Sequence, residues 1–99
     1  MFVKICGITN EDDALLSVAM GADAVGFIFA PSTRQVAAQV VYDITRRLPA
    51  EILTVGVFRN EHPQLVVDTA NRAGVKAVQL SGRETPDQTA EVARHFRWV

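Results

Sequence analysis

The 99-residue chain has a single cysteine, no long apolar segment and almost no net charge. One cysteine cannot form an internal disulfide, so nothing in the sequence indicates an oxidising compartment. The N-terminus lacks the apolar segment of a signal peptide and no run approaches membrane-spanning length, so a cytoplasmic protein without a membrane partner is expected. The net charge of −1 also argues against a general attraction to nucleic acid.

Two kinds of cofactor site are missing from the sequence as well. His62 and His95 are expected on different elements, and with one cysteine they do not give the ligand spacing of a metal site. No phosphate-binding or dinucleotide-binding glycine pattern occurs, because the stretch from Gly21 to Gly26 runs from helix to strand, the wrong order for such a loop. We therefore expect no metal and no cofactor, and any anionic ligand must be held by local groups.

What the sequence does contain is a regular alternation of predicted strands and helices. The strands are expected over residues 2–6, 24–29, 52–58 and 75–80. The helices are expected from a Thr9 cap to Met20, from Val36 to Leu48, from Pro63 to Gly74, and after a capping box formed by Thr85 and Gln88. Such β-α units predict a parallel sheet with right-handed crossovers.

The chain contains only about half of the β-α units that close a barrel. Residues 96–99 resemble the opening of a fifth strand, and eight β-α units in roughly 200 or more residues close a barrel. The sequence thus predicts that residues 1–99 form the N-terminal half of a (β/α)8 TIM barrel, an α/β fold, with no second domain. A half-barrel exposes apolar interior and a free strand edge, so we expect self-association or docking to a complementary half-barrel.

Chemically useful side chains follow each predicted strand. Cys6 ends the first strand, Arg34 lies in the loop after the second, Arg59 and Asn60 follow the third, and Ser81 follows the fourth. Because parallel strands point the same way, these residues are expected at one edge of the sheet, where substrates bind. A thiol, two guanidinium groups, an amide and a hydroxyl together suit an anionic, oxygen-rich small molecule.

Each of these residues also has a simpler explanation. Cys6 is a candidate acid or base, but free cysteines are often buried for packing alone. Arg34 can bind a carboxylate in a bidentate manner, although a solvated loop arginine is the ordinary alternative. For Arg59, pairing with Glu61 at the start of the next helix is the favoured interpretation.

Lys4 and Gln79 are further candidates because side chains along a strand alternate between its faces. Lys4 and Cys6 therefore share the face that would line a barrel, whereas Ile5 faces the helices. Gln79 shares a face with Ser81 in the same way. We predict that Lys4, Gln79 and Ser81 bind substrate; the alternative for Lys4 is a barrel-floor cation paired with a carboxylate from outside this chain.

Several segments occur together in one order along nearly the whole chain. They are Lys4-Ile5-Cys6-Gly7-Ile8-Thr9, Gly21-Ala22-Asp23, Gly26-Phe27-Ile28-Phe29, Ser32-Thr33-Arg34-Gln35-Val36, Val55-Gly56-Val57-Phe58 and Val78-Gln79-Leu80. This ordered set resembles the N-terminal half of the phosphoribosylanthranilate isomerase family of tryptophan biosynthesis. The first segment is fairly specific by itself, and the whole set is strongly specific.

The resemblance implies a cofactor-free Amadori rearrangement of N-(5-phosphoribosyl)anthranilate to 1-(2-carboxyphenylamino)-1-deoxyribulose 5-phosphate. It implies that Cys6 is the general base at the sugar C2 and that Arg34 holds the anthranilate carboxylate. The aspartate general acid and the phosphate-binding loops belong to the second half of the family barrel, so the isolated chain is expected to be an inactive fragment. Where the family has histidine after Gln79-Leu80, this chain has Ser81, which is shorter and does not titrate near neutrality.

Two other classes of function are alternatives. A non-catalytic, flavodoxin-like binding or regulatory module would show clustered acidic residues after its first strand and a finished fifth unit, which are not found here. Another phosphosugar barrel enzyme, such as one of histidine biosynthesis, would have an aspartate at the end of its first strand, where this chain has Cys6.

Overall fold

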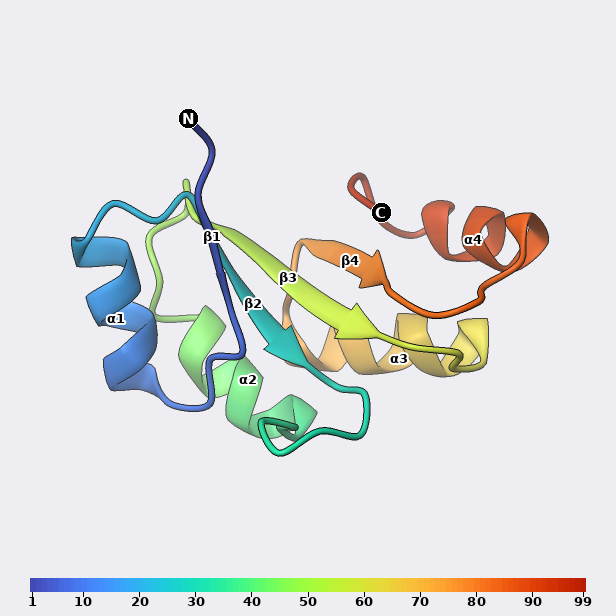
Figure 1. Ribbon diagram of the computed structural model, residues 1–99, viewed down its shortest axis with the longest axis horizontal. Coiled ribbons are helices and arrows are strands. Elements are labelled where there is room, and N and C mark those ends of the chain that lie inside the picture. Colours follow the sequence, from blue (N-terminus) through green and yellow to red (C-terminus); the bar gives the residue numbers. More distant parts are fainter.

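The computed structural model describes residues 1–99 and contains four strands that alternate with four helices (Figure 1). In chain order these are β1 (Lys4–Cys6), α1 (Glu11–Ala19), β2 (Ala24–Ile28), α2 (Ala38–Thr45), β3 (Leu53–Phe58), α3 (Pro63–Ala73), β4 (Ala77–Leu80) and α4 (Pro86–Ala93). The strands form one parallel sheet in the order β1-β2-β3-β4. The chain therefore has the predicted α/β fold with a four-stranded parallel sheet.

Local sequence signals explain most of the helix boundaries. The capping box of Thr85 and Gln88 at the start of α4 is present, and Gly74 ends α3 with a φ of 72° that favours glycine. The prediction that Thr9 caps α1 is wrong. Asn10 has the extended backbone of a cap residue, and its side chain accepts a first-turn N–H at 2.8 Å.

Some predicted elements are longer than the observed ones. The helix expected over 36–48 is confined to Ala38–Thr45, and the following residues form a tighter turn in which the Leu48 N–H donates to the Thr45 carbonyl at 3.2 Å. The predicted strands 2–6 and 75–80 shorten to Lys4–Cys6 and Ala77–Leu80, because only these residues have a paired neighbour in the ladder.

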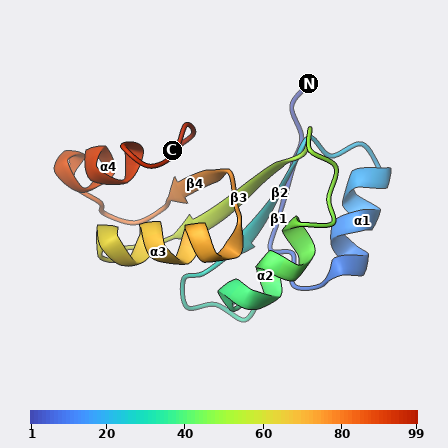
Figure 2. The same ribbon diagram turned by 180° about the vertical axis from the view of Figure 1, so that it is seen from behind.

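The two faces of the sheet differ in what covers them. The outer face packs against the helices. In Figure 1, α1 lies to the left of the strands, α2 and α3 lie below them and α4 lies to the right, and Figure 2 shows α2 and α3 in front of the strands. This core joins Val25, Phe27 and Val78 of the sheet to Val41, Val66 and Val92 of the helices. The inner face carries a smaller cluster without any helical residue: Ala24, Val55, Val57 and Ala77, with Cys6, Ile28 and Leu53 packed beside it.

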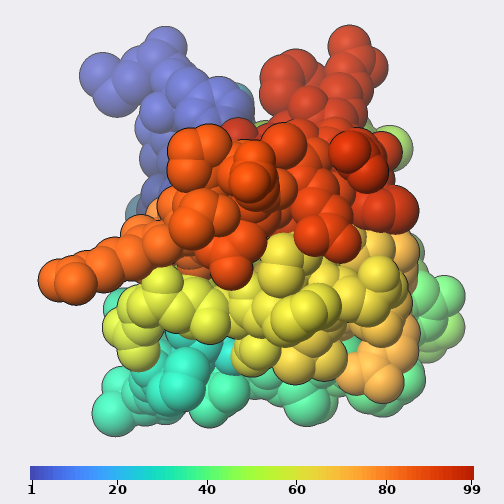
Figure 3. Space-filling model, turned by 90° about the vertical axis from the view of Figure 1, so that its right-hand side faces the viewer, coloured from blue at the N-terminus to red at the C-terminus, as the bar shows by residue number.

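Both edges of the sheet have features that bear on its extension. The expected fifth strand is present only as a parallel bridge between Ala77 and Trp98, where the Val78 N–H donates to the Trp98 carbonyl at 3.0 Å. The N-terminal and C-terminal segments project separately from the same side of the molecule (Figure 3). At the β1 edge, Ile5 lies with Leu16 in an apolar groove of about 390 Å³, so Ile5 faces the helix layer as predicted. No helix has the length and apolar character needed to cross a membrane.

Candidate functional site

The loops that follow the four strands lie together at the carboxyl ends of the strands, which we call the Cys6 edge. Arg34 in the loop after β2 reaches the loop after β1, where its Nη1 donates to the Cys6 carbonyl at 3.5 Å. Arg59 after β3 reaches back to the loop after β2 and donates to the Pro31 carbonyl at 3.5 Å. The predicted pairing of Arg59 with Glu61 is therefore wrong, because the guanidinium turns toward the neighbouring loop; the one ion pair of the chain joins Arg47 and Glu11.

Two glycines shape the surroundings of Cys6. Cys6 is the half-buried last residue of β1 and pairs with Gly26 of β2. A Cβ on Gly26 would lie 3.0 Å from the Cys6 Sγ, so the missing side chain leaves room for the thiol. Gly7 has a φ of 87°, and a side chain there would collide with the Arg34 guanidinium. The thiol and the guanidinium are thereby brought to the same part of the sheet edge.

Lys4, Gln79 and Ser81 are joined by hydrogen bonds across the inner face. The Lys4 Nζ donates to the Gln79 Oε1, and the Gln79 Nε2 donates to the Ser81 Oγ at 3.0 Å. Lys4 forms no ion pair within the chain. In a flat sheet, β1 and β4 would be about 14 Å apart, with side chains roughly perpendicular to the sheet. Contact between these two edge strands therefore indicates strong curvature toward the uncovered face.

Glu84 is a residue of this edge that the sequence reasoning missed. Its carboxylate accepts the Asn60 N–H at 2.6 Å and the Gly82 N–H at 2.8 Å, while the Asn60 side chain accepts the Arg83 N–H at 2.6 Å. Burial raises the pKa of Glu84, but backbone hydrogen bonds from Asn60, Glu84 and Gly82 outweigh it, so the pKa lies below the ordinary value of 4.5. The only sequence signal was an acidic residue two positions after a loop glycine, which is too common to single out.

His62 has a structural role at the start of α3. His62 caps α3, where its Nδ1 accepts the Gln64 N–H at 3.2 Å. No group of three or more histidine, cysteine, aspartate or glutamate side chains is arranged to hold a metal ion.

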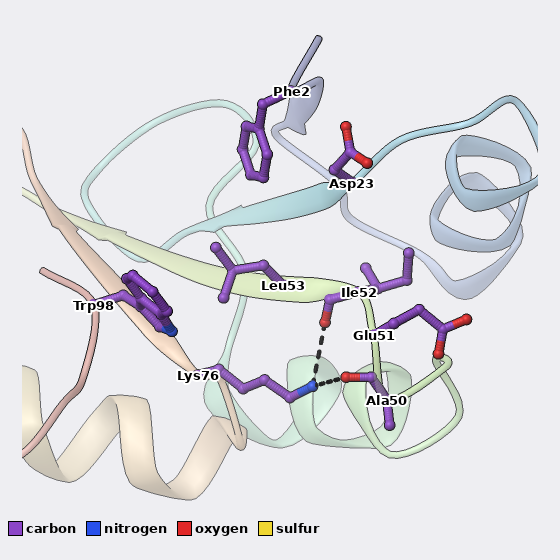
Figure 4. A pocket seen from close by; sticks show the side chains of 8 residues that line it. All are labelled: Phe2, Asp23, Ala50, Glu51, Ile52, Leu53, Lys76 and Trp98. Atoms are coloured by element: carbon purple, nitrogen blue, oxygen red, sulfur yellow. Dashed lines mark hydrogen bonds between the residues drawn. The ribbon is translucent and has the colours of Figure 1, made fainter.

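The largest cavity, about 620 Å³, lies at the opposite ends of the strands (Figure 4). Phe2 and Trp98 stand on two sides of it, and Lys76 reaches the carbonyl groups of Ala50 and Ile52 across its floor. Ligands of parallel β/α sheets bind beyond the carboxyl ends of the strands, and the Lys76 ammonium is already occupied by backbone. We therefore place the candidate site at the Cys6 edge, although that edge is less hollow.

Comparison with known proteins identifies the family of this chain. A curated N-(5'-phosphoribosyl)anthranilate isomerase of Desulforudis audaxviator is 50% identical over 95 residues, which are 96% of this chain and 45% of that protein. The crystal structure of the Thermotoga maritima phosphoribosyl anthranilate isomerase superposes with a TM-score of 0.95 at 44% identity, covering 97% of this chain and 47% of that one.

A further crystal structure of a phosphoribosyl anthranilate isomerase, in complex with reduced 1-(o-carboxyphenylamino)-1-deoxyribulose 5-phosphate, superposes with a TM-score of 0.94 at 44% identity over 97% of this chain and 50% of that one. The chain thus spans about half the length of the relatives it matches. Residues 3–98 match the family described as N-(5'phosphoribosyl)anthranilate (PRA) isomerase, and the chain belongs to that family.

Proposed function

We propose that this chain supplies the first half of a (β/α)8 barrel that isomerises N-(5-phosphoribosyl)anthranilate to the corresponding aminoketose in tryptophan biosynthesis. The observation that carries the proposal is the meeting of Cys6 and Arg34 at the carboxyl edge of the sheet, in a chain of this family. The curvature of the sheet, its uncovered inner face and the half-length match to the relatives support the half-barrel.

In this proposal the two residues divide the work on an anionic substrate. Cys6, as thiolate, is the general base that removes the proton from the sugar C2. Arg34 holds the anthranilate carboxylate in its planar donor fork, which fixes the reacting carbon near the sulfur. Lys4, Gln79 and Ser81 line the inner face from which further substrate oxygens are bound. A reduced carboxyphenylamino deoxyribulose phosphate bound to a relative is consistent with a ligand that carries these anionic groups.

The remaining parts of the reaction are assigned to a second half-barrel. The resemblance places the acid that opens the ribose ring, and the phosphate-binding loops, after later strands of the barrel. Residues 1–99 alone therefore provide neither. The second half would also cover the inner face around Val55 and Val57 and pair with the free edge of β1. We propose that a complementary half-barrel, rather than a second copy of this chain, is the functional partner.

The test is to purify residues 1–99 and follow the loss of substrate fluorescence with and without the second half of the Thermotoga maritima relative. We expect no measurable turnover from the chain alone and turnover after the second half is added. The Cys6→Ala chain with the same second half is the matched control and should turn over more slowly by about a hundredfold or more. Full activity from the isolated chain as a monomer would contradict the half-barrel, and activity of a dimer would identify self-association as the functional state.

A further inference from the structure

The hydrogen bonds from Lys4 through Gln79 to Ser81 have a direction that the chemistry of the groups fixes. A lysine ammonium can only donate, so the Gln79 side chain must present its oxygen to Lys4. Its Nε2, which can only donate, then faces Ser81 at 3.0 Å. The Ser81 Oγ accepts this hydrogen bond, and its own proton is left for another acceptor. No residue of the chain accepts a hydrogen bond from the Ser81 hydroxyl.

The position of Ser81 indicates where its proton goes. Ser81 is exposed and follows β4 at the same sheet edge as Cys6, and its backbone N–H is held by the Phe58 carbonyl at 2.9 Å. Gln79 is half-buried. The positive charge of Lys4 strengthens its hydrogen bond to Gln79 and, through Gln79, the hydrogen bond to Ser81. The Gln79 Nε2 therefore holds the Ser81 hydroxyl in place, and the hydroxyl stays accessible to a ligand at the Cys6 edge.

We infer that Gln79 is a positioning residue, which Lys4 orients so that the Ser81 hydroxyl donates its proton to an oxygen of the substrate. This inference rests on the proposed function, because it assigns the direction of one contact within the same site. It also gives a role to Ser81, which stands where the resemblance implies a histidine. A hydroxyl with a fixed direction supplies a donor there without a titrating ring.

The decisive substitution is Gln79→Glu, which keeps the shape of the side chain and its contact with Lys4. A carboxylate only accepts, so Ser81 must turn its proton toward residue 79 and can no longer donate to the substrate. With the second half of the Thermotoga maritima relative supplied, we expect KM to rise about tenfold, the usual worth of one hydrogen bond, with kcat nearly unchanged. Ser81→Ala should raise KM by a similar factor.

A double-mutant comparison separates positioning from general structural damage. If Gln79 acts through Ser81, Gln79→Glu should have no further effect on KM in the Ser81→Ala chain. The Gln39→Glu chain makes the same chemical change at an exposed position of α2, where Gln39 donates only to Asp43, and its KM should equal that of the parent. An unchanged KM in the Gln79→Glu chain, or effects of Gln79→Glu and Ser81→Ala that multiply in full, would overturn the inference.

A second readout works without catalysis and so separates this inference from the proposed function. In the ¹⁵N-labelled 99-residue chain, both Lys4→Met and Ser81→Ala should shift the side-chain amide resonances of Gln79, while those of Gln39 stay fixed. Unshifted Gln79 resonances would contradict the hydrogen-bonded chain. Shifted resonances together with no isomerase activity after adding the second half would refute the proposed function and the role of Ser81 in it, but leave the geometry intact.

Discussion

Gly26→Ala tests whether the space opposite Cys6 is needed for the thiol. The new Cβ would lie 3.0 Å from the Sγ and 3.4 Å from both the Cα and the Cβ of Cys6. Ordinary contacts between such atoms are about 3.5–4.0 Å, so the thiol must move by about 0.5–1 Å or the two strands must separate. Because β2 is packed against β3 on its other side, we expect the thiol to move toward the uncovered inner face.

The size of the effect follows from two opposing contributions to the free energy of unfolding. Overpacking a closely filled site costs about 1–3 kcal/mol. Replacing glycine also reduces the freedom of the unfolded chain, which stabilises the protein by about 0.4–1 kcal/mol. The two ranges leave a net loss between about 0 and 2.6 kcal/mol, with a central value of about 1.3 kcal/mol. In the assembled enzyme, a displacement of this size at the base should lower turnover by about a hundredfold.

Urea unfolding and alkylation of Cys6 by iodoacetamide measure the two consequences separately. Gly56→Ala is a matched control, since its Cβ would meet Phe29 and Phe58 at 3.1 Å, but on the outer face. Both variants should lose similar stability, whereas only Gly26→Ala should speed the alkylation of Cys6. The reasoning is refuted if the alkylation rates of the parent, the Gly26→Ala chain and the Gly56→Ala chain are the same.

Two further predictions concern the loops of the same edge. Arg34→Lys should raise KM markedly for the anthranilate substrate, because lysine lacks the planar donor fork; an analogue without the carboxylate should lose much less, and equal losses would show that Arg34 is not the carboxylate partner. The pKa of Glu84 is lowered in the folded chain, so its carboxylate stabilises the fold fully above the ordinary pKa of 4.5. This stabilisation is lost as the pH falls through the lowered pKa of the folded chain. The amide resonances of Asn60 and Gly82 should therefore move together in acid, and should lose this titration in the Glu84→Gln chain; independent movement would contradict the shared contact.

The sequence predicted the order of elements well because the signals that decide it are local. Strand-length apolar runs, the Thr85 capping box and Gly74 all act within a few residues, and the structure contains the elements they indicate. The errors are at boundaries where two neighbouring residues can play the same role. Asn10 caps α1 in place of Thr9 because its backbone is extended there, a choice that composition does not determine.

The candidate site was predictable to the extent that it depends on the period of the strands. Alternation put Lys4 with Cys6, and Gln79 with Ser81, on one face, and the contacts agree with both placements. Contacts between loops were not predictable, because they depend on the curvature of the sheet. Arg59 therefore reaches Pro31 instead of Glu61, and Glu84 joins two loops that lie more than twenty residues apart in sequence.

Turnover of the Cys6→Ala chain, assembled with a second half-barrel, tests the central claim most directly. Cys6→Ser is the companion variant, because it keeps the shape of the side chain but not a group that readily ionises near neutrality. We expect both variants to lower turnover by about a hundredfold or more, as for the loss of a general base, while substrate affinity changes less. Near-normal turnover in the Cys6→Ala enzyme would contradict the assignment of Cys6 as the base.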